Sequence, residues 1–240
     1  MEQIYTIPVN QAFEATAADA GCGCPFCMLY NKLEDDELDL ILGASMMEPA
    51  IRIRTNKEGF CKIHYDMMLA RQKRLPMALM LESHLAEVAE QLAGGTFFAK
   101  PVKKIPGVEE TCYVCSRVEF NFKNMIETAV ILWETDDEFR GKFAKSPYFC
   151  LPHYARLDAA AKNRLTRGDY SDFSKISRGI MKNYADSLLS DVSWFCKKFD
   201  YRYDAEPWYN SKDAVERAVK FLRSDLHNPP KTRKPGDTLQ

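Results

Sequence analysis

The sequence lacks features that several large classes of protein require. No stretch approaches the roughly eighteen uninterrupted apolar residues of a membrane-spanning helix. The opening ten residues also lack the basic start and apolar run of a signal peptide. Neither sign of charge dominates, because 33 Lys and Arg residues stand against 34 Asp and Glu residues. These absences predict a soluble cytoplasmic protein with no membrane partner, and they argue against a nucleic-acid partner.

Glycine and proline, at 11 and 12 of 240 residues, are sparse inside the long amphipathic stretches, and no region alternates apolar and polar residues over several strands. Apolar residues make up 46% of the chain, which is enough to bury a core and excludes a disordered protein. We therefore expect an all-α fold. In the stretch 75–92 the apolar residues recur at helical spacing and predict a stripe that faces the core: Leu81, Leu85, Val88 and Leu92.

What the sequence does have is eight cysteines, six of which stand in short motifs. Cys24-Pro-Phe-Cys27 is followed, after 33 intervening residues, by Cys61-Lys-Ile-His64; Cys112-Tyr-Val-Cys115 is followed, after 34, by Cys150-Leu-Pro-His153. The same composite pattern therefore occurs twice, which indicates an internal duplication. In a reducing compartment, thiols grouped in this way are more often metal ligands than disulfides.

Each copy offers three thiolates and one imidazole, a ligand set typical of a four-coordinate zinc site. The sequence thus predicts two zinc ions per chain, held by eight ligands: Cys24, Cys27, Cys61, His64, Cys112, Cys115, Cys150 and His153. We expect the ligands to pair within each copy, although four half-sites can also pair between copies. Cys22 and Cys196 lie outside the pattern, and we interpret them as an exposed thiol and a core thiol.

The motifs also predict a domain organisation. We expect residues 1–95 to form a first Cys3His helical module with an N-terminal arm, and residues 96–111, which contain two prolines, to form a linker. Residues 112–226 are expected to form a second Cys3His module with C-terminal helices, and residues 227–240 a flexible tail. In this scheme each zinc ion joins the start of one helix to the start of another.

Several stretches of the chain resemble a known family. They are Ile4-Tyr-Thr-Ile-Pro-Val-Asn10, Cys24-Pro-Phe-Cys27, Leu42-Gly-Ala-Ser-Met-Met-Glu-Pro49, Arg54-Thr-Asn-Lys-Glu-Gly-Phe-Cys61, Trp194-Phe-Cys-Lys-Lys-Phe-Asp-Tyr-Arg202 and Asn210-Ser-Lys-Asp-Ala214. Together they resemble a bacterial domain family of unknown function that is common in anaerobic Gram-positive bacteria. The resemblance covers nearly the whole chain. It implies a cytoplasmic helical protein with paired Cys-x-x-Cys and Cys-x-x-His motifs, and it implies no activity.

The ligand set bears on function, because a zinc ion with four protein ligands keeps no position for a reacting water. We therefore expect a non-enzymatic structural or interaction protein of unknown process, whose protein partner stays open. The alternative is a redox-active metal-thiolate sensor or enzyme with a labile zinc or iron–sulfur site. A glutaredoxin-like role for Cys24-Pro-Phe-Cys27 is disfavoured, since no parallel strand is predicted before the motif.

Overall fold

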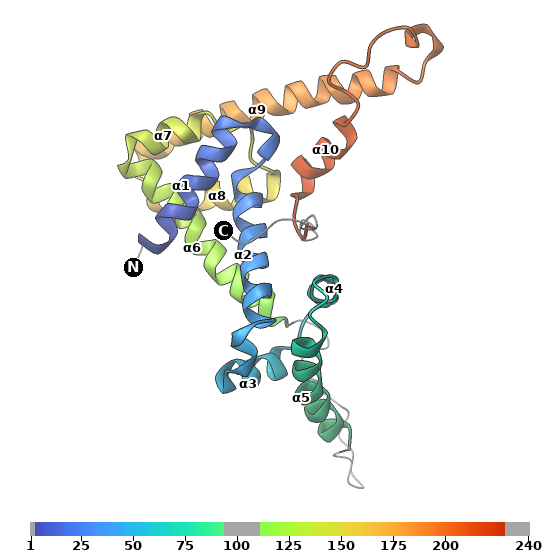
Figure 1. Cartoon of the computed structure of the whole chain (residues 1–240). Coiled ribbons are helices and arrows are strands. Elements are labelled where there is room, and N and C mark those ends of the chain that lie inside the picture. The colour runs from blue at the N-terminus through green and yellow to red at the C-terminus, as the bar shows by residue number, and fades with distance from the viewer. Residues whose placement is uncertain (1–2, 94–110, 229–240) are drawn as a thin grey trace, which may run out of the picture. The chain divides into compact units, whose positions relative to one another are not determined.

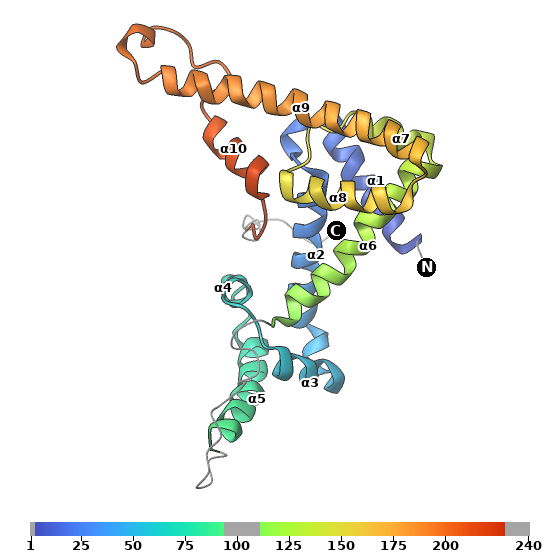
Figure 2. The ribbon, with the colours of Figure 1, turned by 180° about the vertical axis from the view of Figure 1, so that it is seen from behind.

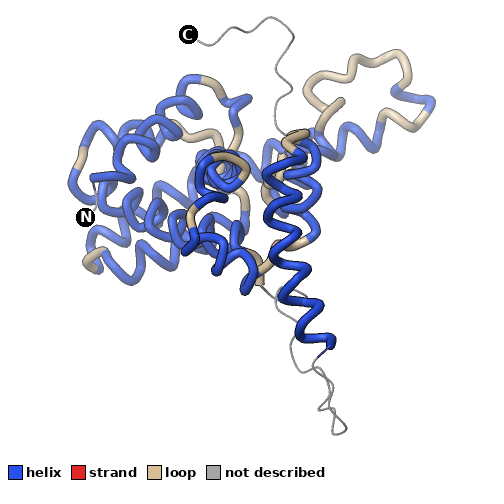
Figure 3. Tube along the Cα trace, turned by 60° about the horizontal axis from the view of Figure 1, so that its bottom comes forward, coloured by secondary structure: helices blue, strands red, loops and turns tan. Residues whose placement is uncertain are grey.

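The structure is a computed structural model that describes residues 3–93 and 111–228. Within these ranges it consists of helices and connecting turns, without a β-strand (Figures 1 and 3). The expected all-α fold is confirmed. No helix in the same ranges combines the length and the apolar character that crossing a membrane requires.

Ten α-helices are found in the described ranges: α1 (Gln3–Ala18), α2 (Pro25–Ile41), α3 (Pro49–Glu58), α4 (Lys62–Ala70), α5 (Arg74–Ala93), α6 (Tyr113–Thr135), α7 (Asp137–Ala144), α8 (Leu151–Arg164), α9 (Arg167–Lys197) and α10 (Ala214–Arg223). Short 3₁₀ helices occupy Ala20–Cys22, Ala44–Met47 and Tyr201–Tyr203.

The chain divides into two compact units. Unit 1 consists of Met1–Tyr30 and Phe122–Leu226, and unit 2 of Asn31–Asn121 and His227–Gln240. These units differ from the expected modules at 1–95 and 112–226, because each combines segments from both halves of the sequence. The expected linker (96–111) and tail (227–240) lie outside the described residues, except for residue 111 and residues 227 and 228.

Aromatic side chains build the core of unit 1. The ring of Phe13 in α1 lies 4.8 Å from that of Phe139 in α7 and 5.5 Å from that of Phe26 in α2, measured between centroids. Phe149, which precedes α8, lies 5.9 Å from Phe26. All four rings are fully buried. Because Phe26 and Phe149 are sequence neighbours of cysteines in the motifs, this core fixes the backbone that carries those thiols.

Residues 3–18, which we placed in an N-terminal arm, form the helix α1. Its buried residues follow helical spacing and face the aromatic core: Val9, Ala12, Phe13 and Thr16. Pro8 lies inside this helix, where a proline removes one backbone hydrogen bond. Burial of one whole face outweighs that cost, so tertiary packing decides the conformation of this segment.

The longest helix of unit 1, α9, runs along α7 and α8, and α10 folds back beside it (Figures 1 and 2). Phe221 of α10 packs on a stack formed by Tyr148 and Tyr184, whose ring centroids are 4.0 Å apart. These contacts hold the end of α10 in place. Ser224 and Asp225, which follow that end, reach one of the cysteine clusters described below.

In unit 2, α3 packs against α5 through buried and partly buried polar contacts. The Arg52 guanidinium donates to the Ser83 hydroxyl at 2.8 Å, and the Asn56 amide donates to Glu87 at 3.0 Å. The expected apolar stripe on α5 is wrong in part, because Leu85 and Leu92 are 61% and 59% exposed. Met77 and Met80 are buried instead, since the face toward α3 is offset from the leucine stripe.

Candidate metal centres

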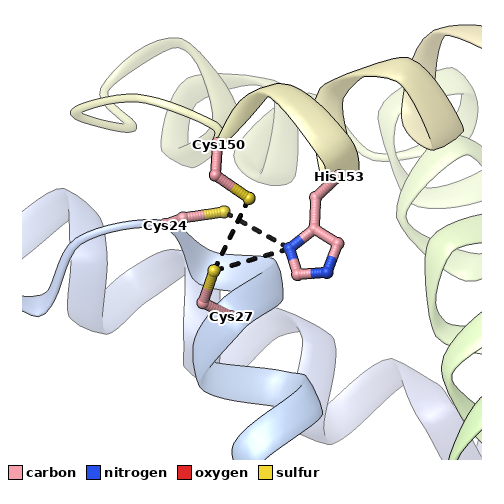
Figure 4. Close-up of side chains that lie close together, drawn as sticks. All are labelled: Cys24, Cys27, Cys150 and His153. Atoms are coloured by element: carbon pink, nitrogen blue, oxygen red, sulfur yellow. Dashed lines mark hydrogen bonds between the residues drawn. The ribbon is translucent and has the colours of Figure 1, made fainter. Parts of the chain in front are cut away.

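The first cluster of candidate metal ligands lies in unit 1 and joins the start of α2 to the start of α8. It consists of Cys24, Cys27, Cys150 and His153, whose ligand atoms all lie within 4.8 Å of one another. Figure 4 shows the three thiols and the imidazole Nδ1 turned toward one another. Cys27 Sγ lies 3.6 Å from Cys150 Sγ and 3.5 Å from His153 Nδ1. Cys24 Sγ lies 3.9 Å from the same nitrogen.

These separations fit a tetrahedral zinc site. With Zn–S bonds of about 2.3 Å and Zn–N bonds of about 2.05 Å, a tetrahedron places two sulfurs about 3.8 Å apart, and a sulfur and a nitrogen about 3.6 Å apart. The observed separations, 3.6 Å between sulfurs and 3.5–3.9 Å from sulfur to nitrogen, lie close to these edges. A disulfide needs sulfurs about 2.05 Å apart. All eight cysteines are free.

Local sequence explains why these side chains converge. Cys24 directly precedes Pro25, the first residue of α2, and Cys150 is the N-cap of α8, which has Pro152 in its first turn. Proline suits the first turn, because the N–H groups there have no helical acceptor. The positive end of the helix dipole also favours a thiolate at this position. Gly23, at φ 76°, adopts a left-handed conformation in which a Cβ would lie 3.2 Å from the Tyr148 hydroxyl.

The first cluster is closed off from solvent. Its four ligand residues are each at most 5% exposed. The Asp225 N–H donates to Cys27 Sγ at 3.4 Å, and the Ser224 hydroxyl lies 3.0 Å from Cys150 Sγ. Hydrogen bonds of this kind offset part of a thiolate's charge and orient the ligand.

Three thiolates cannot share this buried volume without a cation. Burial and hydrogen bonding to Cys150 raise the pKa of the Cys24 thiol well above its usual value. Hydrogen bonding to Cys150 raises the pKa of Cys27 to about 12, whereas the same hydrogen bonds from Cys24 and Cys27 lower the pKa of Cys150. Burial and these hydrogen bonds thus oppose ionisation of Cys24 and Cys27 and favour ionisation of Cys150. A divalent cation supplies the charge that lets all three ionise.

The second cluster lies in unit 2 and joins the start of α4 to the start of α6. It consists of Cys61, His64, Cys112 and Cys115, again within 4.8 Å of one another. His64 Nδ1 lies 3.2 Å from both Cys61 Sγ and Cys112 Sγ, and 3.4 Å from Cys115 Sγ. Cys61 and Cys115 have their sulfurs 3.9 Å apart. A single ion can therefore contact all four ligand atoms in this cluster too.

The two segments of the second cluster are also tied by their backbones. Cys61 is the N-cap of α4, and Cys112 directly precedes α6. The Tyr113 N–H donates to the Gly59 carbonyl at 3.0 Å, and the Thr111 hydroxyl donates to the Glu58 carbonyl at 2.7 Å. These bonds place the two motifs side by side independently of any ion.

A buried carboxylate orients the histidine of the second cluster. Glu34 of α2 is 1% exposed, and its Oε1 lies 2.9 Å from His64 Nε2 and 2.6 Å from His227 Nδ1. When Nε2–H donates to Glu34, Nδ1 keeps its lone pair and faces the thiols, the arrangement seen where a carboxylate supports a metal-bound histidine. Both separations are shorter than the roughly 3.3 Å between nitrogen and oxygen ligands of one tetrahedral ion, so hydrogen bonds explain this trio better.

Charges also couple within the second cluster. Burial alone would lower the pKa of His64, but hydrogen bonds to Cys112 and Glu34 raise it to about 10. The hydrogen bond from Cys115 lowers the pKa of Cys112 to about 3 against the effect of burial. Burial opposes ionisation of Glu34, yet hydrogen bonds from the two histidines lower its pKa. These shifts favour a protonated His64 and an ionised Cys112 when no ion is bound, so a metal that binds Nδ1 competes with a proton there.

A model of a family of unknown function, DUF6062, matches residues 1–229. The chain belongs to this family. The match confirms the resemblance that the motifs indicated. No curated protein and no solved structure matches the chain. The family description names no activity, so the function of this DUF6062 chain has to be argued from its two Cys3His clusters.

All eight predicted ligands of this DUF6062 chain fall into the two clusters, but the expected pairing within each copy is wrong. The first Cys-x-x-Cys motif meets the last Cys-x-x-His motif, and the two inner motifs meet each other. The reason is packing: the buried rings beside Cys27 and Cys150 belong to one aromatic core, which unites the outer motifs. The clusters are therefore nested in the sequence, and each takes ligands from both copies.

Two residues beside the second cluster, Glu34 and His227, were not predicted from the sequence. Glu34 begins an acidic stretch of the sequence, yet helical spacing places it on the same face as the buried Leu38 and Ile41. His227 carries no sequence signal that separates it from the expected tail. Of the two remaining thiols, Cys22 is exposed as expected. Cys196 is exposed too, so its assignment to the core is wrong.

Proposed function

We propose that this protein binds two zinc ions, one in each cluster, and that the ions serve as structural cross-links of a helical scaffold for protein interactions. The observation that carries the proposal is the convergence of eight predicted ligands into two complete Cys3His sets. Soft thiolates together with imidazole favour zinc over magnesium or calcium, which prefer oxygen ligands.

The compactness of each set supports a single ion over an iron–sulfur cluster. A two-iron cluster distributes its four protein ligands over two metal ions, so ligands on different irons lie farther apart than the edge of one tetrahedron. In both clusters the ligand atoms all lie within 4.8 Å of one another. One zinc ion per cluster accounts for that spacing.

A structural role follows from coordination and from topology. Three thiolates and an imidazole fill the four positions of tetrahedral zinc and leave none for a reacting water. Each ion also joins remote segments: Cys27 and His153 are 126 residues apart in the sequence, and His64 and Cys112 are 48 apart. Because closing such loops opposes chain entropy, the free energy of zinc binding becomes free energy of folding.

The experiment that tests the proposal is a metal analysis of protein purified without oxygen and without added metal. We expect two equivalents of zinc per chain by mass spectrometry and no absorption in the visible range. Removal of zinc by a chelator should lower the melting temperature, and restored zinc should bring it back. Iron with visible absorption refutes the assignment to zinc, and a metal-free chain with unchanged stability refutes the structural role.

The interaction role has its own test. The zinc-loaded protein and the chelator-treated protein are compared as baits for binding partners under the same conditions. A partner retained only by the zinc-loaded form supports the scaffold. The same partners on both forms argue that zinc contributes nothing to binding.

A further inference from the structure

The two clusters share a ligand set but differ in access to solvent. All four ligands of the first cluster are buried. In the second cluster His64 and Cys112 are buried, whereas Cys61 and Cys115 are partly exposed. Two cysteines of the second cluster are therefore more accessible to a dissolved reagent than any ligand residue of the first.

The clusters also differ in the hydrogen bonds that their sulfurs accept. In the first cluster Cys27 accepts from the Asp225 N–H, and Cys150 contacts the Ser224 hydroxyl. In the part of the chain that the structure describes, no hydrogen-bond donor from outside the cluster contacts Cys61 or Cys115. Hydrogen bonds reduce the nucleophilicity of a metal-bound thiolate, so these two sulfurs keep more of theirs.

We propose that the second cluster is a site of reversible thiol oxidation, in which Cys61 and Cys115 react with a hydroperoxide, form a disulfide and release the zinc ion. The inference rests on the proposed binding of zinc and adds which cluster responds, which thiols react and what chemical class of oxidant they take. The two sulfurs lie 3.9 Å apart, so they can join after small rotations of their side chains.

The chemistry balances with hydrogen peroxide as the oxidant. One thiolate attacks an oxygen of the peroxide, the O–O bond breaks, and a sulfenic acid and hydroxide form. The second thiolate attacks the sulfenic sulfur, the S–S bond forms, and a second hydroxide leaves. Two thiolates thus give two electrons to one peroxide. A dithiol reductant reverses the step.

Loss of two thiolates removes half of the ligands of the second cluster. His64 and Cys112 remain, and two ligands do not hold a structural zinc ion. The backbone bonds from Thr111 and Tyr113 to residues 58 and 59 do not depend on zinc. These bonds keep the two motifs together after the ion leaves. Release of the ion thus loosens unit 2 without separating its two motifs, while the cluster of unit 1 stays closed.

The test uses the full-length, zinc-loaded protein with Cys22→Ala and Cys196→Ala, because these exposed thiols lie outside both clusters and would also consume peroxide. Hydrogen peroxide is added, and a chromophoric chelator reports the zinc that is released. We expect release to stop at one of the two equivalents. Mass spectrometry should then find a disulfide between Cys61 and Cys115. Dithiothreitol with added zinc should restore two bound equivalents.

Three results overturn the inference. The first is retention of both zinc ions at a peroxide concentration that oxidises Cys22 in the protein without substitutions. The second is release of both zinc ions together. The third is a disulfide that links other cysteines. A starting protein without two zinc equivalents contradicts the proposed function instead. The two failures are thus distinguished before peroxide is added.

Discussion

From the contact between Glu34 and His64 we predict that Glu34 raises the zinc affinity of the second cluster. Glu34 Oε1 is the hydrogen-bond partner of His64 Nε2 at 2.9 Å and of His227 Nδ1 at 2.6 Å, and the carboxylate is almost fully buried. Replacing Glu34 with Ala leaves His64 Nε2 without this acceptor and removes the charge that makes the imidazole a stronger ligand. Loss of a hydrogen-bond partner behind a metal-bound histidine typically costs about 10–100-fold in metal affinity, or about 1.4–2.7 kcal/mol.

The substitution Glu34→Gln removes the charge of the side chain but keeps its shape, so it separates the two contributions to zinc affinity. A glutamine carbonyl can still accept from His64, but its amide occupies the position of Oε2, which has no hydrogen-bond partner among the described residues. We therefore expect Glu34→Gln to weaken zinc binding less than Glu34→Ala does. The matched control is Glu37→Gln on the same helix, because Glu37 pairs with Arg117 at 3.5 Å and is not part of the cluster.

The assay is competition for zinc against a chelator of known affinity, which resolves two binding steps per chain. In both Glu34 variants one step should weaken and the other, from the first cluster, should keep its affinity. The control should keep both. Equal weakening of both steps would show that the substitution damages the fold generally. Unchanged affinity in Glu34→Ala would show that the carboxylate does not support His64.

The remaining predictions concern ligand identity and protons. Cys61→Ser should lower bound zinc by about one equivalent and increase hydrogen exchange in unit 2, whereas Cys24→Ser should do so in unit 1; the opposite pattern contradicts the observed grouping. Cys196→Ala should leave two zinc equivalents, as metal analysis can show. Zinc binding at pH 7 should release the proton of His64 Nδ1, because the pKa of the metal-free imidazole is about 10. Calorimetry in two buffers of different ionisation enthalpy measures this release, which should decline as the pH rises past 10. Since protons and zinc compete for the ligands, affinity should fall as the pH falls.

Much of the fold could be predicted from the sequence because its signals are local. Long amphipathic stretches with little glycine or proline inside them indicate helices, and Pro25 and Pro152 mark the first turns of α2 and α8. Two errors came from tertiary effects. Pro8 lies inside α1, whose burial outweighs the lost hydrogen bond. On α5, the leucines recur at helical spacing and predicted the buried face, but the position of α3 decides which face is covered.

The eight residues of the clusters could also be predicted from the sequence, whereas their grouping could not. Spacing of two residues between Cys and Cys or His identifies a half-site, since both side chains then lie on one side of a helix start. Nothing in that spacing says which half-site it meets. Glu34 shows the same limit, because a carboxylate in an acidic run reveals its partner only when the fold places His64 beside it.

The grouping of the half-sites follows from apolar packing. Pairing within copies and pairing between copies both yield two Cys3His sets, so the ligand count and the charge of the sites are the same in either arrangement. The difference lies beside the ligands: Phe26 and Phe149 are fully buried, 5.9 Å apart, and each is adjacent to a cysteine of the first cluster. Pairing within copies would separate these rings and expose apolar surface, at about 1.5–3 kcal/mol for each large side chain. Zinc bound as proposed would thus stabilise an arrangement that the aromatic core has already selected.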